Sequence, residues 1–173
     1  MMQPKTRPAP GSAQLAAGTA VGTLHGDAVP ILIRESVLDE ILNYSELDLR
    51  CEVGGFLVGG CHQDRGTFVE VRHFLPATDA RSRPASLTFT HDTWAAMTRQ
   101  VEQRFPGAQV VGWHHTHPDL GVFLSGYDLF IHRHFFAAPW QIAMVVDPCR
   151  KEFCFFQWRG ERIDDCGFVC VPP

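Results

Sequence analysis

The stretch GWHHTHPDLGVFLSGYD, from Gly112 to Asp128, restricts the fold and the chemistry of this chain more than any other segment. Side chains on a β-strand alternate between the two faces of its sheet. If VVGWHHTH forms a strand, His115 and His117 point to one side of the sheet. His114 and Thr116 then point to the other side. Two imidazoles one pleat repeat apart can bind a single zinc ion, which takes nitrogen ligands at about 2.0–2.1 Å.

Ser125 and Asp128 form the pattern S-x-x-D, which is typical of a capping box at a helix N-terminus. Taken alone, this pattern predicts only that Ser125 is the N-cap and that Asp128 reaches back to it. The same geometry holds Asp128 at a helix start, facing the loop that follows the histidines, where it can be a third metal ligand. The combined spacing of two histidines, a serine and an aspartate arises by chance about once in a thousand chains of this size. We therefore favour a metal site.

The remaining chain alternates between strand patterns and helix patterns. We expect strands at 31–34, 51–60, 67–74, 87–90, 110–117, 141–146 and 152–158, with the last two forming a hairpin. We expect helices that begin with Ser36, Asp92 and Ser125 as N-caps, and a loop over residues 76–86. This alternation predicts an α/β domain with a mixed central sheet flanked by helices.

The composition indicates one globular domain. The chain has 173 residues, of which 45% are hydrophobic, and a net charge of -4 that offers no basic surface for nucleic acid. No apolar run is long enough to cross a bilayer, so we expect no membrane contact. Residues 1–28 are broken by Gly and Pro and lack the apolar centre of a signal peptide. We expect them to be a flexible tail before a domain over 29–173, and we expect a cytoplasmic location.

Other possible metal ligands are weaker candidates. The six cysteines contain no C-x-x-C pair, and we expect reduced, mostly buried thiols. Cys166 and Cys170 leave open a second metal site, although no partner pair is evident. His132 and His134 are two residues apart on an expected helix, so their side chains diverge. We expect them to be surface residues rather than ligands.

The segment HTHPDLGVFLSGYD resembles the JAMM motif of the MPN-domain zinc metalloproteases, and CEVGGFLVGG resembles the strand that carries the catalytic glutamate of that family. The resemblance implies that His115, His117 and Asp128 bind Zn²⁺, that Glu52 is the general base, and that Ser125 is the serine of the motif. It extends over most of the chain and implies a cytidine-deaminase-like MPN (JAMM) domain over residues 29–173.

The resemblance also implies a mechanism. Three protein ligands leave one zinc position open, which is typical of a catalytic site. Glu52 would take a proton from water and deliver it to the leaving amine, and the hydroxyl of Ser125 would stabilise the oxyanion. His114, which faces away from the metal, is expected to pack behind the site.

Enzymes similar to this chain cleave isopeptide or peptide bonds after the C-terminal glycines of ubiquitin or ubiquitin-like proteins. The eukaryotic members carry two insertions, and the loop 76–86 can correspond to the first. The second is missing because the helix after Ser125 runs almost directly to Trp140. The chain is therefore more similar to the compact prokaryotic members, which accompany E1- and E2-like enzymes. The expected partners are a ubiquitin-like protein, its conjugates and these enzymes.

Two further functions remain open at this stage. A peptidase that processes a ubiquitin-like precursor or a sulfur-carrier adduct would use the same site residues. A non-catalytic MPN scaffold predicts gaps in the set of ligands, and this sequence has no such gap. A nucleobase deaminase would need a P-C-x-x-C signature, which the sequence lacks.

Overall fold

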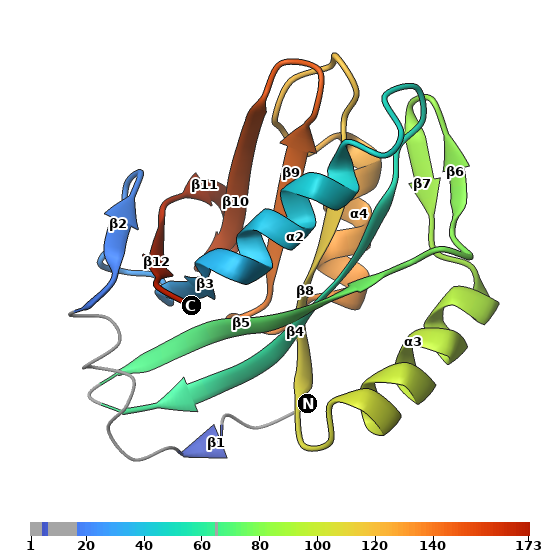
Figure 1. Ribbon diagram of the computed structural model, residues 1–173. Coiled ribbons are helices and arrows are strands. Elements are labelled where there is room, and N and C mark those ends of the chain that lie inside the picture. The colour runs from blue at the N-terminus through green and yellow to red at the C-terminus, as the bar shows by residue number, and fades with distance from the viewer. Residues whose placement is uncertain (1–4, 7–16, 65) are drawn as a thin grey trace.

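A ten-stranded mixed sheet forms the centre of the part of the chain that the structure describes (Figure 1). This computed structural model describes residues 5–6, 17–64 and 66–173. The strands are β1 (Lys5–Thr6), β2 (Thr19–Val21), β3 (Ile31–Arg34), β4 (Gly54–Gln63), β5 (Thr67–Pro76), β8 (Gln109–Thr116), β9 (Ile142–Asp147), β10 (Glu152–Arg159), β11 (Arg162–Cys166) and β12 (Phe168–Val171). They follow the order β11-β10-β9-β8-β4-β5-β3-β12-β2, with β1 beside β4. Strand β8 is antiparallel to β4 and parallel to β9, which confirms the predicted mixed sheet.

Three helices of the described residues cover the two faces of the sheet. They are α2 (Glu35–Ser45), α3 (His91–Arg104) and α4 (Gly126–Phe135). Helix α2 packs Ile41 into the core on one face, together with Leu57. Helices α3 and α4 pack Val101 and Ile131 on the other face, together with Phe56. Figure 1 shows α2 in front of the sheet and α4 behind it. Phe56 and Leu57 are neighbours on β4 but pack into the cores on opposite faces, because strand side chains alternate. The predicted α/β class is therefore confirmed.

Two strand predictions need correction. Strand β4 begins at Gly54 rather than at residue 51, because the Glu52 N–H donates to Arg83 O (2.8 Å) outside the main sheet. The expected loop 76–86 contains β6 (Arg81–Arg83), which pairs with β7 (Ser86–Thr88) in a separate two-stranded hairpin. This hairpin lies beside the segment that precedes β4 (Figure 1).

Two helix caps also differ from the prediction. Helix α2 begins before Ser36, and its N-cap Arg34 makes no side-chain hydrogen bond, because the helix follows β3 directly. Helix α3 has Thr90 as its N-cap in a reciprocal capping box with Thr93. The expected cap Asp92 lies in the first turn instead, where a carboxylate interacts favourably with the helix dipole.

The first part of the chain contributes to the sheet before residue 29. Strand β2 pairs antiparallel with β12, and β12 pairs in parallel with β3. Residues 1–4 and 7–16 of the expected flexible tail lie outside the described residues. The domain boundary at residue 29 stays a prediction. Among the helices of the described residues, none combines the length and apolarity needed to cross a membrane.

Candidate metal centre

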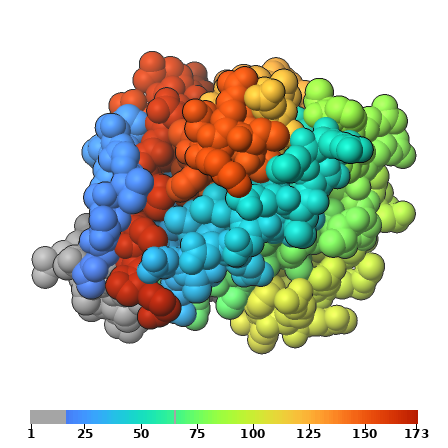
Figure 2. Space-filling view, turned by 45° about the horizontal axis from the view of Figure 1, so that its top comes forward, coloured from blue at the N-terminus to red at the C-terminus, as the bar shows by residue number. Residues whose placement is uncertain are grey.

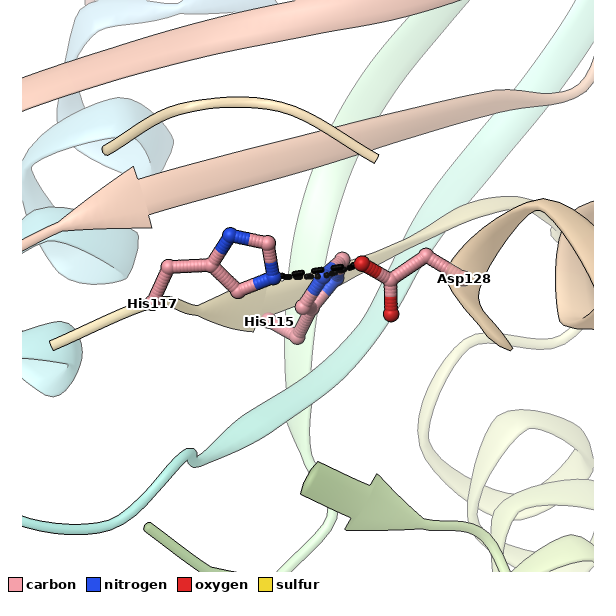
Figure 3. A group of neighbouring side chains, drawn as sticks. All are labelled: His115, His117 and Asp128. Carbon is pink, nitrogen blue, oxygen red and sulfur yellow. Dashed lines mark hydrogen bonds and ion pairs between the residues drawn. The ribbon is translucent and has the colours of Figure 1, made fainter. Parts of the chain in front are cut away.

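His115, His117 and Asp128 converge on one point at the end of β8 and the start of α4 (Figure 3). The Nε2 atoms of the two imidazoles lie 3.0 Å apart. Asp128 Oδ2 lies 3.1 Å from Nε2 of His115 and 3.2 Å from Nε2 of His117. All three side chains are buried, with at most 4% of any of these residues exposed. The alternation predicted from the sequence therefore brings the two histidines together.

This group of atoms fits a zinc ion. Tetrahedral zinc with bonds of about 2.0–2.1 Å has its ligand atoms about 3.3 Å from one another. The three measured separations of 3.0, 3.1 and 3.2 Å are close to one face of such a tetrahedron. Three acceptor atoms buried at these distances repel one another unless a cation or shared protons lie between them. The donor set of two imidazoles and one carboxylate suits zinc among other divalent metals, and leaves one tetrahedral position for a reactant.

The environment fixes the protonation of the two histidines. Burial lowers the pKa of His115 and favours a neutral ring, which stacks on Trp113 with centroids 4.4 Å apart. His117 donates its Nδ1–H to Gly121 O (3.2 Å), which leaves Nε2 with a lone pair for a metal. Burial opposes a charge on His117, but its hydrogen bond with Asp128 and the nearby carboxylates raise its pKa overall. A bound metal would replace a proton there.

The predicted capping box at α4 is confirmed. Ser125 Oγ accepts from the Asp128 N–H (3.1 Å), and Asp128 Oδ2 accepts from the Ser125 N–H (2.8 Å). Burial opposes the ionised form of Asp128, but the hydrogen bonds with His115 and His117 outweigh it and lower the pKa of the carboxyl. The oxygen that takes part in the cap is thus the one that points at the two imidazoles. Capping and metal binding use the same carboxylate atom.

Glu52 lies against this group from the segment before β4. Its Oε1 is 3.7 Å from Nε2 of His117, and only 4% of the residue is exposed. Burial raises its pKa to about 7, and the adjacent His117 opposes that shift. The next residues join β4 to β8, since the Val53 N–H donates to Thr116 Oγ1 (2.9 Å). Gly54 permits this approach, because a Cβ there would lie 2.2 Å from His114 O.

The predictions for the other histidines and for the cysteines have mixed outcomes. His114 faces the opposite core, as expected, where Nε2 lies 2.9 Å from Ser45 Oγ. His132 and His134 diverge, but the prediction that His132 is exposed is wrong: it is fully buried, because the indole N–H of Trp113 donates to its Nδ1 (3.0 Å). All six cysteines are free, as predicted, but the prediction that most of them are buried is wrong, since only Cys61 and Cys166 are. Among the described residues, no metal group of three or more includes a cysteine.

Sequence reasoning missed two side chains beside the site. Ser82 Oγ donates to Glu52 O (2.5 Å) from the β6–β7 hairpin. Asp147 accepts hydrogen bonds from the loop between His117 and Ser125. An Asp-Pro pair at residues 147–148 signals a turn, but neither contact can be found without knowing which strands and loops are neighbours.

Comparison with known proteins agrees with this arrangement. The model of the family described as JAB1/Mov34/MPN/PAD-1 ubiquitin protease matches residues 18–138. A solution structure of protein DSY2949 from Desulfitobacterium hafniense superposes with a TM-score of 0.62 and 19% identity. The match covers 83% of this chain and 94% of that one, and at this identity it shows the fold alone.

Two characterised relatives match part of their own length. "NAD(+) hydrolase TcpA" of Theionarchaea archaeon (strain DG-70-1) is 27% identical over 140 residues, which are 80% of this chain and 37% of that protein. "COP9 signalosome complex subunit 5" of Caenorhabditis elegans is 29% identical over 102 residues, which are 57% of this chain and 27% of that protein. The chain thus spans a minor part of each relative, so their full activities do not transfer to it directly.

Proposed function

This chain belongs to the JAB1/Mov34/MPN/PAD-1 family, and on that premise we propose that it is a zinc-dependent isopeptidase. Its reaction would remove a ubiquitin or ubiquitin-like protein from conjugates by hydrolysis after the C-terminal glycine of the modifier. The observation that carries the proposal is the buried convergence of His115, His117 and Asp128 next to the buried carboxylate of Glu52. A scaffold has no need of a general base with a raised pKa at an open metal position.

Glu52 is suited to move the proton in this reaction. When bound, Zn²⁺ makes water acidic enough to supply a nucleophile near neutral pH and polarises the carbonyl under attack. A carboxylate with a pKa of about 7 can both accept a proton from water and release it to a departing amine. Burial, which raises this pKa, also excludes bulk water that would compete for the proton.

Ser125 is suited to stabilise the charge that develops on the carbonyl oxygen. Its Oγ accepts from the Asp128 N–H with one lone pair, while the hydroxyl proton stays free to donate. The cap fixes this hydroxyl at the start of α4, next to the metal ligand Asp128. A donor held in place before the reaction stabilises an oxyanion more than a mobile one does.

The substrate class follows from the family and fits the surroundings of Glu52. An extended Gly-Gly tail can pair with the edge of a strand and pass through a space that side chains would block. The β6–β7 hairpin stands apart from the main sheet and contacts Glu52, so its edge offers such pairing beside the base. E1- and E2-like enzymes that attach the same modifier are the expected partners. One relative is named an NAD(+) hydrolase, and we do not propose that activity for this site.

Cleavage of defined conjugates tests the proposal. Ubiquitin and a ubiquitin-like sulfur-carrier protein, each joined through the C-terminal glycine to a lysine side chain, are incubated with the enzyme with and without a zinc chelator. We expect chelator-sensitive cleavage, and Glu52→Gln should lower kcat by about 10²–10⁴-fold while zinc stays bound. The exposed carboxylate of Glu102 provides the control, since Glu102→Gln should leave the rate unchanged.

The outcomes separate the related functions. Cleavage of a linear C-terminal extension but not of the lysine conjugate would favour precursor processing at the same site. A protein that binds no zinc and cleaves neither substrate would contradict the proposal and favour a scaffold.

A further inference from the structure

Asp147 is a fully buried carboxylate at the end of β9 that organises two loops at once. Its Oδ2 accepts from the Gly121 N–H at 2.8 Å. Its Oδ1 accepts from three further backbone N–H groups at 3.0–3.1 Å, those of Asp119, Cys149 and Arg150. Burial opposes its ionisation, but these hydrogen bonds lower its pKa. Asp147 therefore joins the β9–β10 turn to the loop that connects His117 to Ser125, here called the 118–124 loop.

Strand register brings this carboxylate beside a metal ligand. Strands β8 and β9 are parallel, and Thr116 is paired with Val146. The following residues, His117 and Asp147, are therefore neighbours, and the His117 N–H donates to Val146 O (2.9 Å). In Figures 1 and 2 the orange β9–β10 turn and the amber 118–124 loop lie side by side at the upper edge of the molecule.

The 118–124 loop connects Asp147 to the ring of His117 through two hydrogen bonds of Gly121. Gly121 donates its N–H to Asp147, and its carbonyl accepts the Nδ1–H of His117 at 3.2 Å. The loop needs such support, because Asp119 has a positive φ angle of 58°, which is unfavourable for a residue other than glycine. Gly121 adopts its φ angle of 86° without this cost. The backbone N–H that Oδ2 accepts thus belongs to the residue that orients the imidazole, and Arg150 Nε lies 3.5 Å from the same oxygen.

We propose that Asp147 is a positioning residue for the metal ligand His117 and acts through the peptide of Gly121. Its carboxylate fixes the Gly121 carbonyl, which keeps the proton of the ring on Nδ1 and directs Nε2 toward His115 and Asp128. This inference rests on the metal site of the proposed function. Groups that orient a metal-binding histidine in this way typically contribute a factor of about 10–100 in metal affinity.

Asp147→Asn is the variant that removes the anchor of Gly121 and keeps the three hydrogen bonds at Oδ1. An amide has one oxygen and one NH₂ group in place of two acceptor oxygens. The oxygen will take the Oδ1 position, where three N–H groups point, and the NH₂ will then face the Gly121 N–H. The β9–β10 turn keeps its hydrogen bonds, whereas Gly121 loses its anchor. We expect a folded protein with an altered 118–124 loop.

Two measurements on this variant test the proposal. Zinc affinity, measured by competition between the protein and a chromophoric chelator for zinc alone, should fall by about 10–100-fold. In the metal-free protein, the Nδ1–H of His117 observed by NMR should exchange with water at least about tenfold faster, because its acceptor has moved. The same loop provides the control Asp119→Asn. That change removes an exposed charge but keeps every backbone hydrogen bond of Asp147, and it should leave both values within about twofold of wild type.

A second variant covers the case in which Asp147→Asn does not fold. Gly121→Ala strains the loop at a φ of 86° without touching β9, since the added Cβ meets only the Arg150 side chain at 3.5 Å. It should lower zinc affinity at least about threefold. Unchanged zinc affinity and unchanged proton exchange in the folded variants would overturn the proposal. If wild type binds no zinc, the proposed function fails, and the exchange of the His117 proton still decides whether Asp147 positions the ring.

Discussion

Ser125 and Thr90 hold the same position at the starts of two different helices. Each is an N-cap whose side chain accepts a backbone N–H three residues later in a reciprocal capping box. Only Ser125 borders the metal centre, because its partner in the box is Asp128. The pair therefore separates what a cap contributes to stability from what the hydroxyl contributes to catalysis.

We expect Ser125→Ala and Thr90→Ala to lower the free energy of unfolding by a similar amount, about 1 kcal/mol each. Only Ser125→Ala should also lower kcat, by about 10²–10³-fold, since it removes the proposed oxyanion donor. Urea unfolding and conjugate cleavage measure the two effects. Equal kcat values for the two variants would exclude Ser125 from the reaction.

His132 makes stability depend on pH. Burial lowers its pKa to about 4, and the charge of Arg133 adds to this shift. Above pH of about 6.5 the ring is neutral in both the folded and the unfolded state, and its contribution to stability is fully present. As the pH falls from about 6.5 toward 4, His132 binds a proton in the unfolded state but not in the folded state. Stability should fall there by about 1.4 kcal/mol per pH unit, or roughly 3 kcal/mol in all.

The variant His132→Gln isolates this effect, because an amide oxygen can still accept from the Trp113 indole while the side chain no longer titrates. Urea unfolding of the metal-free proteins at pH 7, 5.5 and 4.5 should give a shallower loss of stability for the variant. Parallel curves for the two proteins would contradict the assignment to His132.

The residues of the site differ in how far the sequence could predict them. His115, His117, Ser125 and Asp128 lie within one short stretch, so strand alternation and the capping pattern suffice to group them. Glu52 is distant in the sequence, and only the resemblance to a family pointed to it. The burial of His132 could not be foreseen, because its partner Trp113 approaches through tertiary packing rather than local sequence.

At the scale of elements, the β6–β7 hairpin supports Glu52, the proposed general base. The backbone of Glu52 lies outside β4 and instead bonds to the hairpin on both sides, through its N–H to Arg83 O and through its carbonyl to Ser82 Oγ. A general base must keep its carboxylate within hydrogen-bond reach of the proton that it moves. The hairpin therefore connects the region where we expect substrate to bind with the position of Glu52.

Ser82→Ala should weaken this support. Loss of one hydrogen bond worth about 1 kcal/mol should lower kcat by roughly fivefold, with KM and zinc affinity changed by less than about twofold. Ser82→Thr keeps the hydroxyl and should restore most of the rate. Ser86→Ala is the matched control on the facing strand, since the described residues show no hydrogen bond from the Ser86 side chain. A rate loss equal in Ser86→Ala would indicate a general effect on the hairpin.

Strands with a clear apolar pattern could be predicted from the sequence. Strands whose order depends on tertiary contacts could not. The predicted strand at 67–74 follows apolar alternation, and those at 110–117, 141–146 and 152–158 are runs rich in apolar and aromatic residues. They agree with β5, β8 and the β9–β10 hairpin. Strand β7 overlaps the predicted strand 87–90, but β6 lies in the predicted loop 76–86, whose Pro and Ser content favours a loop. The order of this hairpin comes from pairing between β6 and β7 and from contact with Glu52, neither of which leaves a periodic pattern.

At the scale of the whole molecule, the candidate metal centre lies where the sheet meets a helix. Two candidate ligands come from the end of β8 and one from the start of α4, so a bound ion would link elements that otherwise meet through side-chain packing. An ion that binds the folded state and not the unfolded chain stabilises the fold by mass action. At free zinc about 1,000-fold above Kd, the gain is about 4 kcal/mol.

Metal removal should therefore lower Tm by roughly 10 °C, taking about 2–4 °C per kcal/mol for a domain of this size. Thermal unfolding of the wild type with zinc and with excess chelator measures this shift. Asp128→Asn should lose most of the shift, because an amide is a weaker ligand than a carboxylate. His134→Gln, a change at an exposed histidine on α4, should keep the full shift. If zinc stabilised Asp128→Asn as much as wild type, the ion would bind elsewhere, and the link between β8 and α4 would have to arise from packing alone.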